Sequence, residues 1–475
     1  MKGTLTAPAR IQWRPVSIVM VASFMAILDS FIVVVAGPAI QADLGTSSGE
    51  LQWILAGYQL TYAVILVTGG RLGDMYGRKR IFIVGMALFM FSSYACALAA
   101  TAVVLIVARL AQGVGAALMV PQVFAIITLL VPSKQLPRAF GVLGMVMGLA
   151  TIGGQLIGGL LIGADLFGSG WRPVFWINIP IGLAAILLAG RWIPESRAAD
   201  ARRLDLTGVA VLSGALFLLV FPLIQGHEYG WPWWTWTALA TAIAAFVVFG
   251  YVERAIGARG GDPLLRPSLL STRSFSVGLV LVLAVYVVIT SYYLVLSVAL
   301  QEGLGMSALG AGLVYTPAAA TFFTFSLIAS RLVPQYGRRV LEFGAIILAI
   351  GYASTALVLL SGLPFAPGVI IPTLMLQSVG GGLLITPSLN AVLSRINPDD
   401  AGIASGALST AQQVGGALGV AIIGVVFYGS LHPSADGRVV AAAHGLAMSS
   451  IFTMVTALVA AVLVLLLPTL RSQSS

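Results

Sequence analysis

Apolar segments of about 20 residues recur along the whole chain, and they constrain its fold more than any other feature. A helix of this length is what crosses a lipid bilayer. Charged residues make up only 9% of the 475 residues, against about 25% in a typical soluble domain. The chain is therefore expected to be an all-α integral membrane protein with about fourteen transmembrane helices. The apolar segments lie at 16–38, 51–70, 81–100, 103–130, 138–163, 174–190, 206–225, 235–252, 275–300, 309–330, 341–361, 368–393, 403–428 and 447–468.

The first apolar segment and the single cysteine each exclude an alternative interpretation. The first segment is too long for a signal peptide and lacks a small-residue cleavage site, so we expect it to be retained as a span. The only cysteine, Cys96, lies within an apolar segment. A single cysteine excludes an internal disulfide and a cysteine-based metal site.

Basic residues are distributed unevenly between alternate loops. With the N-terminus in the cytoplasm, all but three of the 25 Lys and Arg residues fall in cytoplasmic loops or termini; the exceptions are Arg109, Arg172 and Arg438. This bias follows the positive-inside rule, and it predicts a multi-pass plasma-membrane protein with both termini in the cytoplasm. The net charge of +9 therefore reflects membrane topology, and no nucleic acid partner is expected.

Two stretches of the chain resemble each other, which indicates an internal repeat. Residues 71–79 read RLGDMYGRK and residues 331–339 read RLVPQYGRR, with five of nine positions identical. A shorter pair, QGVG at 112–115 and QSVG at 377–380, has nearly the same offset. Repeated halves are the usual build of secondary transporters.

The two halves are not equivalent in charge. Asp74 of the first half aligns with Pro334, Arg109 aligns with Leu374, and Asp29 has no acidic counterpart. The offset between the copies exceeds the length of six spans, which leaves room for two additional helices. We therefore predict a six-helix bundle at 1–195, two linker transmembrane helices at 196–265 and a second six-helix bundle at 266–475.

Asp29 stands in the middle of the apolar stretch FMAILDSFIVVV. A carboxylate at membrane depth costs about 2.5–3.5 kcal/mol on insertion scales, so such a residue is a functional candidate. Asp29 lies about nine residues, or roughly 14 Å, from the outer end of its segment, and Arg109 about six residues, or roughly 9 Å. The two side chains are expected to meet. One interpretation is that Asp29 couples proton movement to transport; the other is a static ion pair with Arg109.

The loop GRLGDMYGRKR at 70–80 is a candidate conformational gate. Its glycines permit a tight turn and close helix approach. Its acid can cap a helix or pair with a basic residue in one conformer and release it in another. Topology alone would explain the basic residues, but not the acid and the glycines. The gate residues are Gly70, Arg71, Gly73, Asp74, Gly77 and Arg78.

A substrate pocket is expected between the two halves near the membrane midplane. Any one polar side chain in a span is as easily a helix–helix hydrogen bond as a ligand contact, so the candidates are taken as a group. With one acid and one base at depth, the pocket suits amphipathic organic compounds that are neutral or singly charged. The candidates are Tyr58, Gln59, Tyr62, Gln112, Tyr292, Tyr293, Gln377, Asn390, Gln412 and Gln413.

Together these motifs resemble the major facilitator superfamily, and within it the fourteen-span drug:proton antiporters. The loop at 70–80, RLAQGVGAALMVP at 109–121, LDSFIVVVAGPAI at 28–40 and WRPVFWINIPIG at 171–182 are similar to family motifs. The antiporter motif of span 5 departs from the family pattern, because Gln155 replaces the expected proline. The other members of that motif are glycines: Gly154, Gly158 and Gly159.

The resemblance implies a monomeric exporter of amphipathic drugs, antibiotics or toxic metabolites, which works by alternating access and uses the proton gradient without a cofactor. The absence of a Walker A pattern fits an ion gradient as the energy source. A proton-coupled importer of a small organic nutrient shares the fold and the acid. An intramembrane enzyme lacks the expected HExxH or GxSxG patterns, and a non-transporting receptor would not need a titratable acid.

Overall fold

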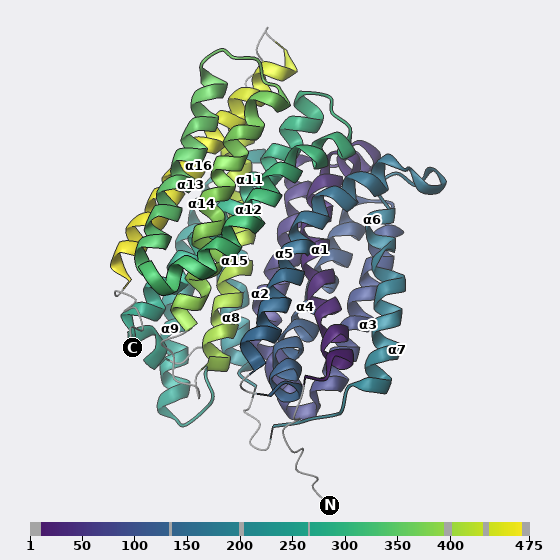
Figure 1. The fold of residues 1–475 in the computed structure, drawn as a ribbon, viewed down its shortest axis with the longest axis vertical. Coiled ribbons are helices and arrows are strands. Elements are labelled where there is room, and N and C mark those ends of the chain that lie inside the picture. Colours follow the sequence, from purple (N-terminus) through teal and green to yellow (C-terminus); the bar gives the residue numbers. More distant parts are fainter. Residues whose placement is uncertain are drawn as a thin grey trace, which may run out of the picture.

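A computed structural model describes residues 11–132, 135–198, 204–264, 267–393, 401–430 and 437–467. Throughout this part of the chain the regular structure is helical (Figure 1). Fourteen helical segments are long and apolar enough to cross a membrane, which confirms the number of spans expected from the sequence. The sixth span consists of the short α6 followed by α7.

The spans of the first half and the linker are α1 (Trp13–Leu44), α2 (Ser48–Tyr76), α3 (Arg78–Ala97), α4 (Ala102–Leu130), α5 (Leu136–Gly163), α6 (Pro173–Trp176), α7 (Asn178–Trp192), α8 (Leu206–Glu228) and α9 (Trp233–Ala258). Those of the second half are α11 (Arg273–Val298), α12 (Ala308–Tyr336), α13 (Arg338–Leu360), α14 (Pro367–Leu393), α15 (Ala401–Gly429) and α16 (Arg438–Leu466). Three short helical segments complete the list: η2 (Leu166–Gly168), α10 (Pro267–Ser271) and η3 (Ala299–Gly303).

The ends of several spans differ from the apolar segments, and α1 shows why. The apolar segment ends at residue 38, but α1 continues through Pro38 to Leu44, where Gly45 in the left-handed conformation (φ 62°) ends it. Polar residues near a membrane surface remain helical although they lie outside the apolar segment. Asp29 is therefore fifteen residues from the end of α1, or about 22 Å along the helix.

The first half and the second half lie side by side in Figure 1, in purple to blue and in green to yellow. The linker helices α8 and α9 pack against each other, and α8 also contacts α2 and α15, one helix from each half. We call the side of the bundle where α1 begins the N-terminal side, and the opposite side the far side.

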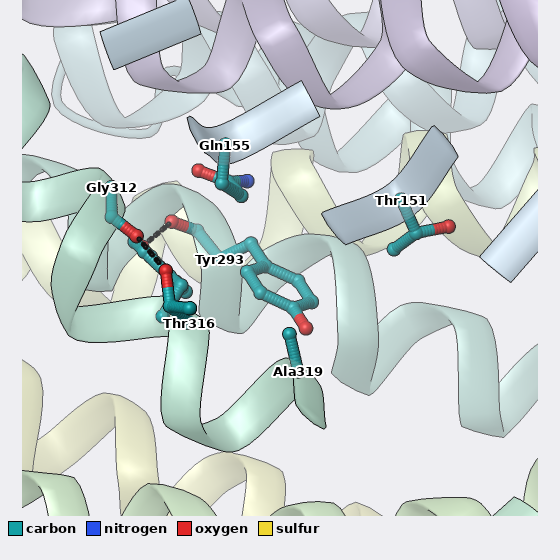
Figure 2. Close-up of a pocket in the computed structure, with 7 residues that line it drawn as sticks. Thr151, Gln155, Tyr293, Gly312, Thr316 and Ala319 are labelled. Atoms are coloured by element: carbon teal, nitrogen blue, oxygen red, sulfur yellow. Dashed lines mark hydrogen bonds between the residues drawn. The ribbon is translucent and has the colours of Figure 1, made fainter. Parts of the chain in front are cut away.

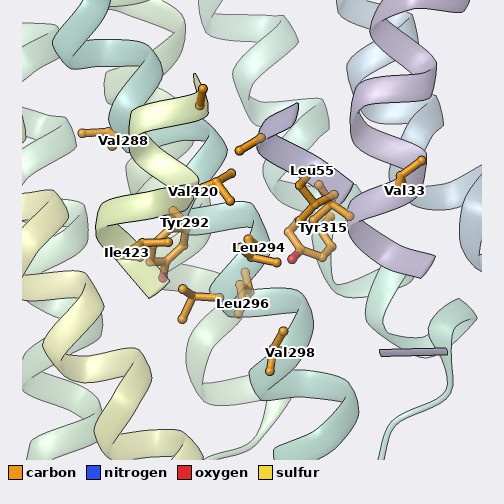
Figure 3. Close-up of a cluster of buried hydrophobic side chains, with 14 of the residues drawn as sticks. Val33, Leu55, Val288, Tyr292, Leu294, Leu296, Val298, Tyr315, Val420 and Ile423 are labelled. Carbon is orange, nitrogen blue, oxygen red and sulfur yellow. The ribbon is translucent and has the colours of Figure 1, made fainter. Parts of the chain in front are cut away.

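Apolar side chains seal the contact between the halves toward the far side. Figure 3 shows Leu55 of the first half beside Tyr315 of the second. Val33, Leu294 and Val420 belong to the same buried cluster. Two hydrogen bonds connect α11 and η3 to α1 in this region. The Ser297 hydroxyl donates to the carbonyl of Val34 (3.2 Å), and the Gln301 amide donates to that of Val35 (3.0 Å).

The helix α5 meets the second half only in part of its length. A Cβ atom at Gly159 would lie 2.6 Å from the carbonyl oxygen of Ala308 on α12, so the two backbones are close there. Nearer the N-terminal side, no described atom lies within 4 Å of a Cβ built at Gly141, Gly144 or Gly148. The halves are thus closed on the far side and apart at α5 on the N-terminal side.

The internal repeat corresponds to equivalent helix contacts in the two halves. Gly115 of α4 packs against α3, where its Cβ would lie 2.6 Å from the amide nitrogen of Phe89. Gly380 of α14 packs against α13, with its Cβ 2.3 Å from the amide nitrogen of Leu348. The QGVG and QSVG sequences therefore end in the same packing position of each half.

Replacing Gly115 by alanine is expected to lower the melting temperature of the detergent-solubilised protein by several degrees. The added methyl must displace the backbone of α3, and overpacking of this kind costs about 1–3 kcal/mol. The matched control is Gly141→Ala, which adds a methyl where the described structure leaves space. Alanine also favours a helix over glycine. Equal melting temperatures for the two variants would contradict the close α3–α4 contact.

Candidate functional site

Asp29 and Arg109 form an ion pair inside the first half. The Arg109 guanidinium donates to Oδ2 of Asp29, and the two side chains are 1% and 0% exposed. A buried pair is stabilised only when hydrogen bonds satisfy the remaining donors and acceptors. The surroundings of this pair are therefore as important as the pair itself.

Two amides complete the coordination of the Asp29 carboxylate. Its Oδ1 accepts from Nε2 of Gln112 (2.8 Å) and from Nδ2 of Asn178 (3.0 Å). With Arg109, three donors surround the two oxygens, an arrangement that suits the ionised carboxylate. A proton on Oδ1 or Oδ2 would have to displace or reorient at least one of these donors.

Arg109 is itself held by groups from three helices. Its Nε donates to the carbonyl of Ile54 on α2 (3.1 Å), and the guanidinium donates to Oε1 of Gln112 (2.7 Å). The ring of Tyr58 lies under the guanidinium at 4.3 Å, a favourable cation–π distance. The Tyr58 hydroxyl donates to the carbonyl of Ala26 on α1 (3.1 Å). The guanidinium therefore joins α1, α2 and α4.

Asn178 was not among the residues selected from the sequence. It is the first residue of α7 and lies next to Ser93 of α3, with Nδ2 3.0 Å from the Ser93 hydroxyl. That hydroxyl donates to the carbonyl of Phe175 (2.9 Å), which fixes the entry to α7. The only signal in the sequence was an amide within the motif WRPVFWINIPIG, far from Asp29 along the chain.

The second half contains a neutral version of this network. Gln377, the counterpart of Gln112 in the repeat, donates from Nε2 to the Tyr292 hydroxyl (3.1 Å) and to Oγ1 of Thr355 (2.8 Å). All three are buried. The glutamine is shared by the two halves, but a tyrosine on α11 stands where the first half has the acid on α1.

The sequence-predicted pocket residues lie in several places. Tyr62 packs edge-on to Tyr58 with ring centroids 6.0 Å apart. Gln59 lies against Gly416 of α15, whose Cβ would be 2.3 Å from its Oε1. Gln412 and Gln413 are half-buried on α15, and the side chain of Asn390 is outside the described residues. Gln112 and Gln377 belong to the two networks above.

One pocket does lie between the two halves, among α5, α11 and α12 (Figure 2). It contains about 220 Å³ of empty space, part of which is open to solvent. Of the ten predicted pocket residues, Tyr293 is the one that lines it, together with Gln155 of the antiporter motif. The full lining is Thr151, Gln155, Tyr293, Gly312, Tyr315, Thr316 and Ala319.

The glycines of the antiporter motif bring α5 against the turn of α1 that carries Asp29. A Cβ at Gly154 would lie 2.7 Å from Cβ of Phe31 and 3.1 Å from the carbonyl oxygen of Leu28. A Cβ at Gly158 would lie 2.9 Å from the side chain of Ile32. Because Gly159 meets α12, α5 is held between the α1 turn and the second half.

The candidate gate packs against the segments that flank the linker helices. Asp74 pairs with Arg78 at 2.8 Å and does not cap a helix. Its carbonyl accepts from the amide of Ala198 (3.1 Å). The Arg71 guanidinium donates to the carbonyls of Asp262 and Pro263. Among the described contacts, Arg71 therefore binds the segment after α9.

Glu195 also contacts the candidate gate, and the sequence did not reveal this contact. Its carboxylate accepts from the amides of Lys79 (3.1 Å) and Arg80 (3.2 Å) at the start of α3. An acid at this position satisfies free amides and complements the helix dipole. The turn before α3 needs a glycine at residue 77. Gly77 has φ +114°, and a Cβ there would lie 2.6 Å from the Glu195 carboxylate.

The second copy of this loop makes a different contact. Arg338, the counterpart of Arg78, pairs with Glu342 at 2.6 Å. It also donates to the carbonyls of Leu465 (3.0 Å) and Leu467 (2.7 Å) at the end of α16. Thus Arg338 holds a helix of its own half, without an acid at the position of Asp74.

Removing one member of the Asp29–Arg109 pair should destabilise the protein more than removing both. Arg109→Gln leaves a buried carboxylate without its cation, and breaking a buried pair this way costs about 3–5 kcal/mol. The double variant Asp29→Asn, Arg109→Gln should recover part of the lost melting temperature. Arg172→Gln is the control, because the Arg172–Asp43 pair is partly exposed. Additive losses in the double variant would show that the two residues are not coupled.

The chain matches the model of the Major Facilitator Superfamily over residues 19–252 and 198–420. It is 37% identical over 445 residues to the probable actinorhodin transporter of Streptomyces coelicolor, covering 92% of this chain and 76% of that protein. It is 34% identical to the cephamycin export protein CmcT of Amycolatopsis lactamdurans (85% and 82% covered). It is 32% identical to the puromycin resistance protein pur8 of Streptomyces alboniger (98% and 93% covered).

Solved structures share the fold at low sequence identity. A POT family transporter in complex with a thioalcohol-conjugated peptide has a TM-score of 0.69 at 14% identity, with 95% of each chain covered. A bacterial homologue of the human lysosomal transporter Spinster, in an inward-facing conformation, has a TM-score of 0.66 at 17% identity, with 95% of this chain and 96% of that chain covered. The chain therefore belongs to the Major Facilitator Superfamily and is a multi-pass membrane transporter, not an enzyme.

Proposed function

We propose that this protein is a proton-driven exporter of amphipathic organic compounds such as antibiotics. The names of three relatives, which describe transport, export or resistance, support the class of substrate. The observation that carries the proposal is the buried carboxylate of Asp29, which connects α1 with three other helices, α2, α4 and α7, through its partners. The protein would act as a monomer in the plasma membrane, without a cofactor.

The orientation follows from the distribution of basic residues, which favours the N-terminal side as the cytoplasmic one. In this orientation the far side faces outward, and the apolar cluster between the halves closes it. The opening at α5 then faces the cytoplasm. A conformation of this kind takes up an export substrate from the cell.

The coupling step would begin with the proton on Asp29. Protonation removes the negative charge that holds Arg109, Gln112 and Asn178, so the network must rearrange. Because Gly154 and Gly158 pack on the Asp29 turn, a movement of α1 is transmitted to α5 and to its contact with α12. Outward-facing protein would take up a proton, and an inward-facing state would follow its release.

The gate would act on the cytoplasmic side. Asp74–Arg78 is a partly exposed pair, which contributes only about 0–1 kcal/mol and is therefore easily exchanged. Glu195 and Arg71 connect the same loop to the linker segments. Closure of the cytoplasmic side would allow Asp74 to change partners while Glu195 keeps α3 in place.

Asp29→Asn is expected to abolish proton-driven export while the protein remains folded in the membrane. Asparagine keeps the size of the side chain but cannot exchange the proton. Only its single oxygen can accept from the donors around Asp29, so a lower melting temperature should accompany the loss of export. Export of a fluorescent amphipathic dye from energised cells should fall to the level of cells without the protein. Asp43→Asn, at a partly exposed ion pair, is the control at matched expression. Export at the wild-type rate in Asp29→Asn would rule out this role.

Everted membrane vesicles distinguish export from the alternative, proton-coupled import. In vesicles without an imposed pH gradient, an antiporter carries substrate added outside into the lumen in exchange for luminal protons, so the lumen becomes more alkaline. A symporter would carry protons inward with the substrate and acidify the lumen. Acidification on addition of substrate would favour a nutrient symporter.

A further inference from the structure

Gln155 is a buried amide without a hydrogen-bond partner among the described residues. Its side chain is 2% exposed, and neither Nε2 nor Oε1 is satisfied. An amide can donate two hydrogen bonds and accept two. Leaving such a group unpaired costs about 1–3 kcal/mol, so a residue in this state requires an explanation.

Gln155 differs from the other glutamines that have an unpaired atom at the contact between the halves. Oε1 of Gln52 and Oε1 of Gln59 point at Gly424 and Gly416 of α15, where a Cβ would lie 2.2 and 2.3 Å away. These two side chains fill notches in a packed helix contact. Gln155 instead lines the pocket between α5, α11 and α12.

The other polar groups of this pocket are mostly used within their own segments. The hydroxyl of Thr151 donates to the carbonyl of Met147 (3.1 Å), and that of Thr316 donates to Gly312 (3.3 Å). The Tyr315 hydroxyl donates to the backbone carbonyl of Tyr293 (2.9 Å). Figure 2 shows Gln155 above Thr316 in this view, with the Tyr293 ring to one side of both. The Gln155 amide and the Tyr293 hydroxyl thus remain as available donors and acceptors.

Aromatic rings form one wall of the pocket. Tyr293 and Tyr315 are stacked with centroids 5.3 Å apart and an angle of 29° between their planes. Phe31 meets Tyr293 edge-on at 5.5 Å. No charged side chain is among the lining residues. A flat, neutral aromatic ligand fits such a wall, because rings prefer offset-stacked or edge-on contacts at these distances.

We propose that Gln155 is a specificity-determining residue that reads the edge of a neutral fused-ring aromatic substrate. The recognised edge carries a hydrogen-bond donor beside an acceptor, as a lactam does, so that the Gln155 amide forms two hydrogen bonds with it. The rings of the ligand pack on Tyr293. This inference rests on the proposed export function, since it names the substrate class of that pathway.

The position of the pocket connects its occupant with the proton site. Phe31 is two residues after Asp29 on α1 and contacts the Tyr293 ring. Gly154 packs on the same turn of α1, directly before Gln155. A ligand held by Gln155 and Tyr293 therefore touches the two helices that also surround Asp29.

The test uses two fluorescent probes, phenanthridin-6(5H)-one and its N-methyl derivative, with the full-length protein in detergent. The first has a donor beside its carbonyl, and the second has lost only the donor. Wild-type protein should bind the first about tenfold more tightly, because a lost hydrogen bond leaves the Gln155 oxygen unpaired. Gln155→Met, which keeps the length of the side chain, should remove this preference. Gln225→Met on α8 should keep it.

Tyr293→Leu should weaken both probes equally, since it removes the ring contact and not the hydrogen bonds. Equal binding of the two probes by wild-type protein, no binding of either, or a preference retained in Gln155→Met would overturn the proposal. The wild-type comparison needs no variant to fold. Binding in detergent requires no proton gradient, so loss of dye export in Asp29→Asn is a separate result. Each proposal can therefore fail without the other.

Discussion

The arrangement of the first half depends on the burial of one negative charge. Asp29 is fully buried, and an ion of this size pays several kcal/mol on leaving water. The compensation comes from Arg109, Gln112 and Asn178, which lie on α4 and α7. Arg109 in turn binds the α2 backbone at Ile54. Four helices thus converge because none of these polar groups has water as an alternative partner.

Glycines on α5 connect the buried Asp29 network to the second half of the molecule. Gly154 and Gly158 let α5 lie on the backbone of α1, and Gly159 lets the same helix lie on α12. In a membrane, helices associate through such close packing, since lipid offers no hydrophobic drive between them. The α1 turn with Asp29 is consequently connected to the second half by two close helix contacts, α1 with α5 and α5 with α12.

Comparison of the halves shows that only the first has a buried ion pair at this place in the repeat, among the residues that the structure describes. Gln112 and Gln377 occupy the same place in the repeat and are both centres of buried hydrogen bonds. In the second half, Tyr292 and Thr355 satisfy the amide without any charge. The second half keeps a buried glutamine-centred network without a charge, while the first half has the Asp29–Arg109 ion pair. The two halves are thus alike in fold and different in buried charge.

The sequence by itself determined the helical membrane fold, the number of spans and the repeat, because hydropathy and charge bias are properties of consecutive residues. It also singled out Asp29 and Arg109, since a charge within an apolar segment is visible without coordinates. Only the tertiary structure decided that Asn178 and Glu195 join these sites and that Gln155 faces a pocket. Contacts between distant helices depend on how each helix is rotated, and a polar residue in a span has the same sequence signature whether it meets a helix, an ion or a cavity.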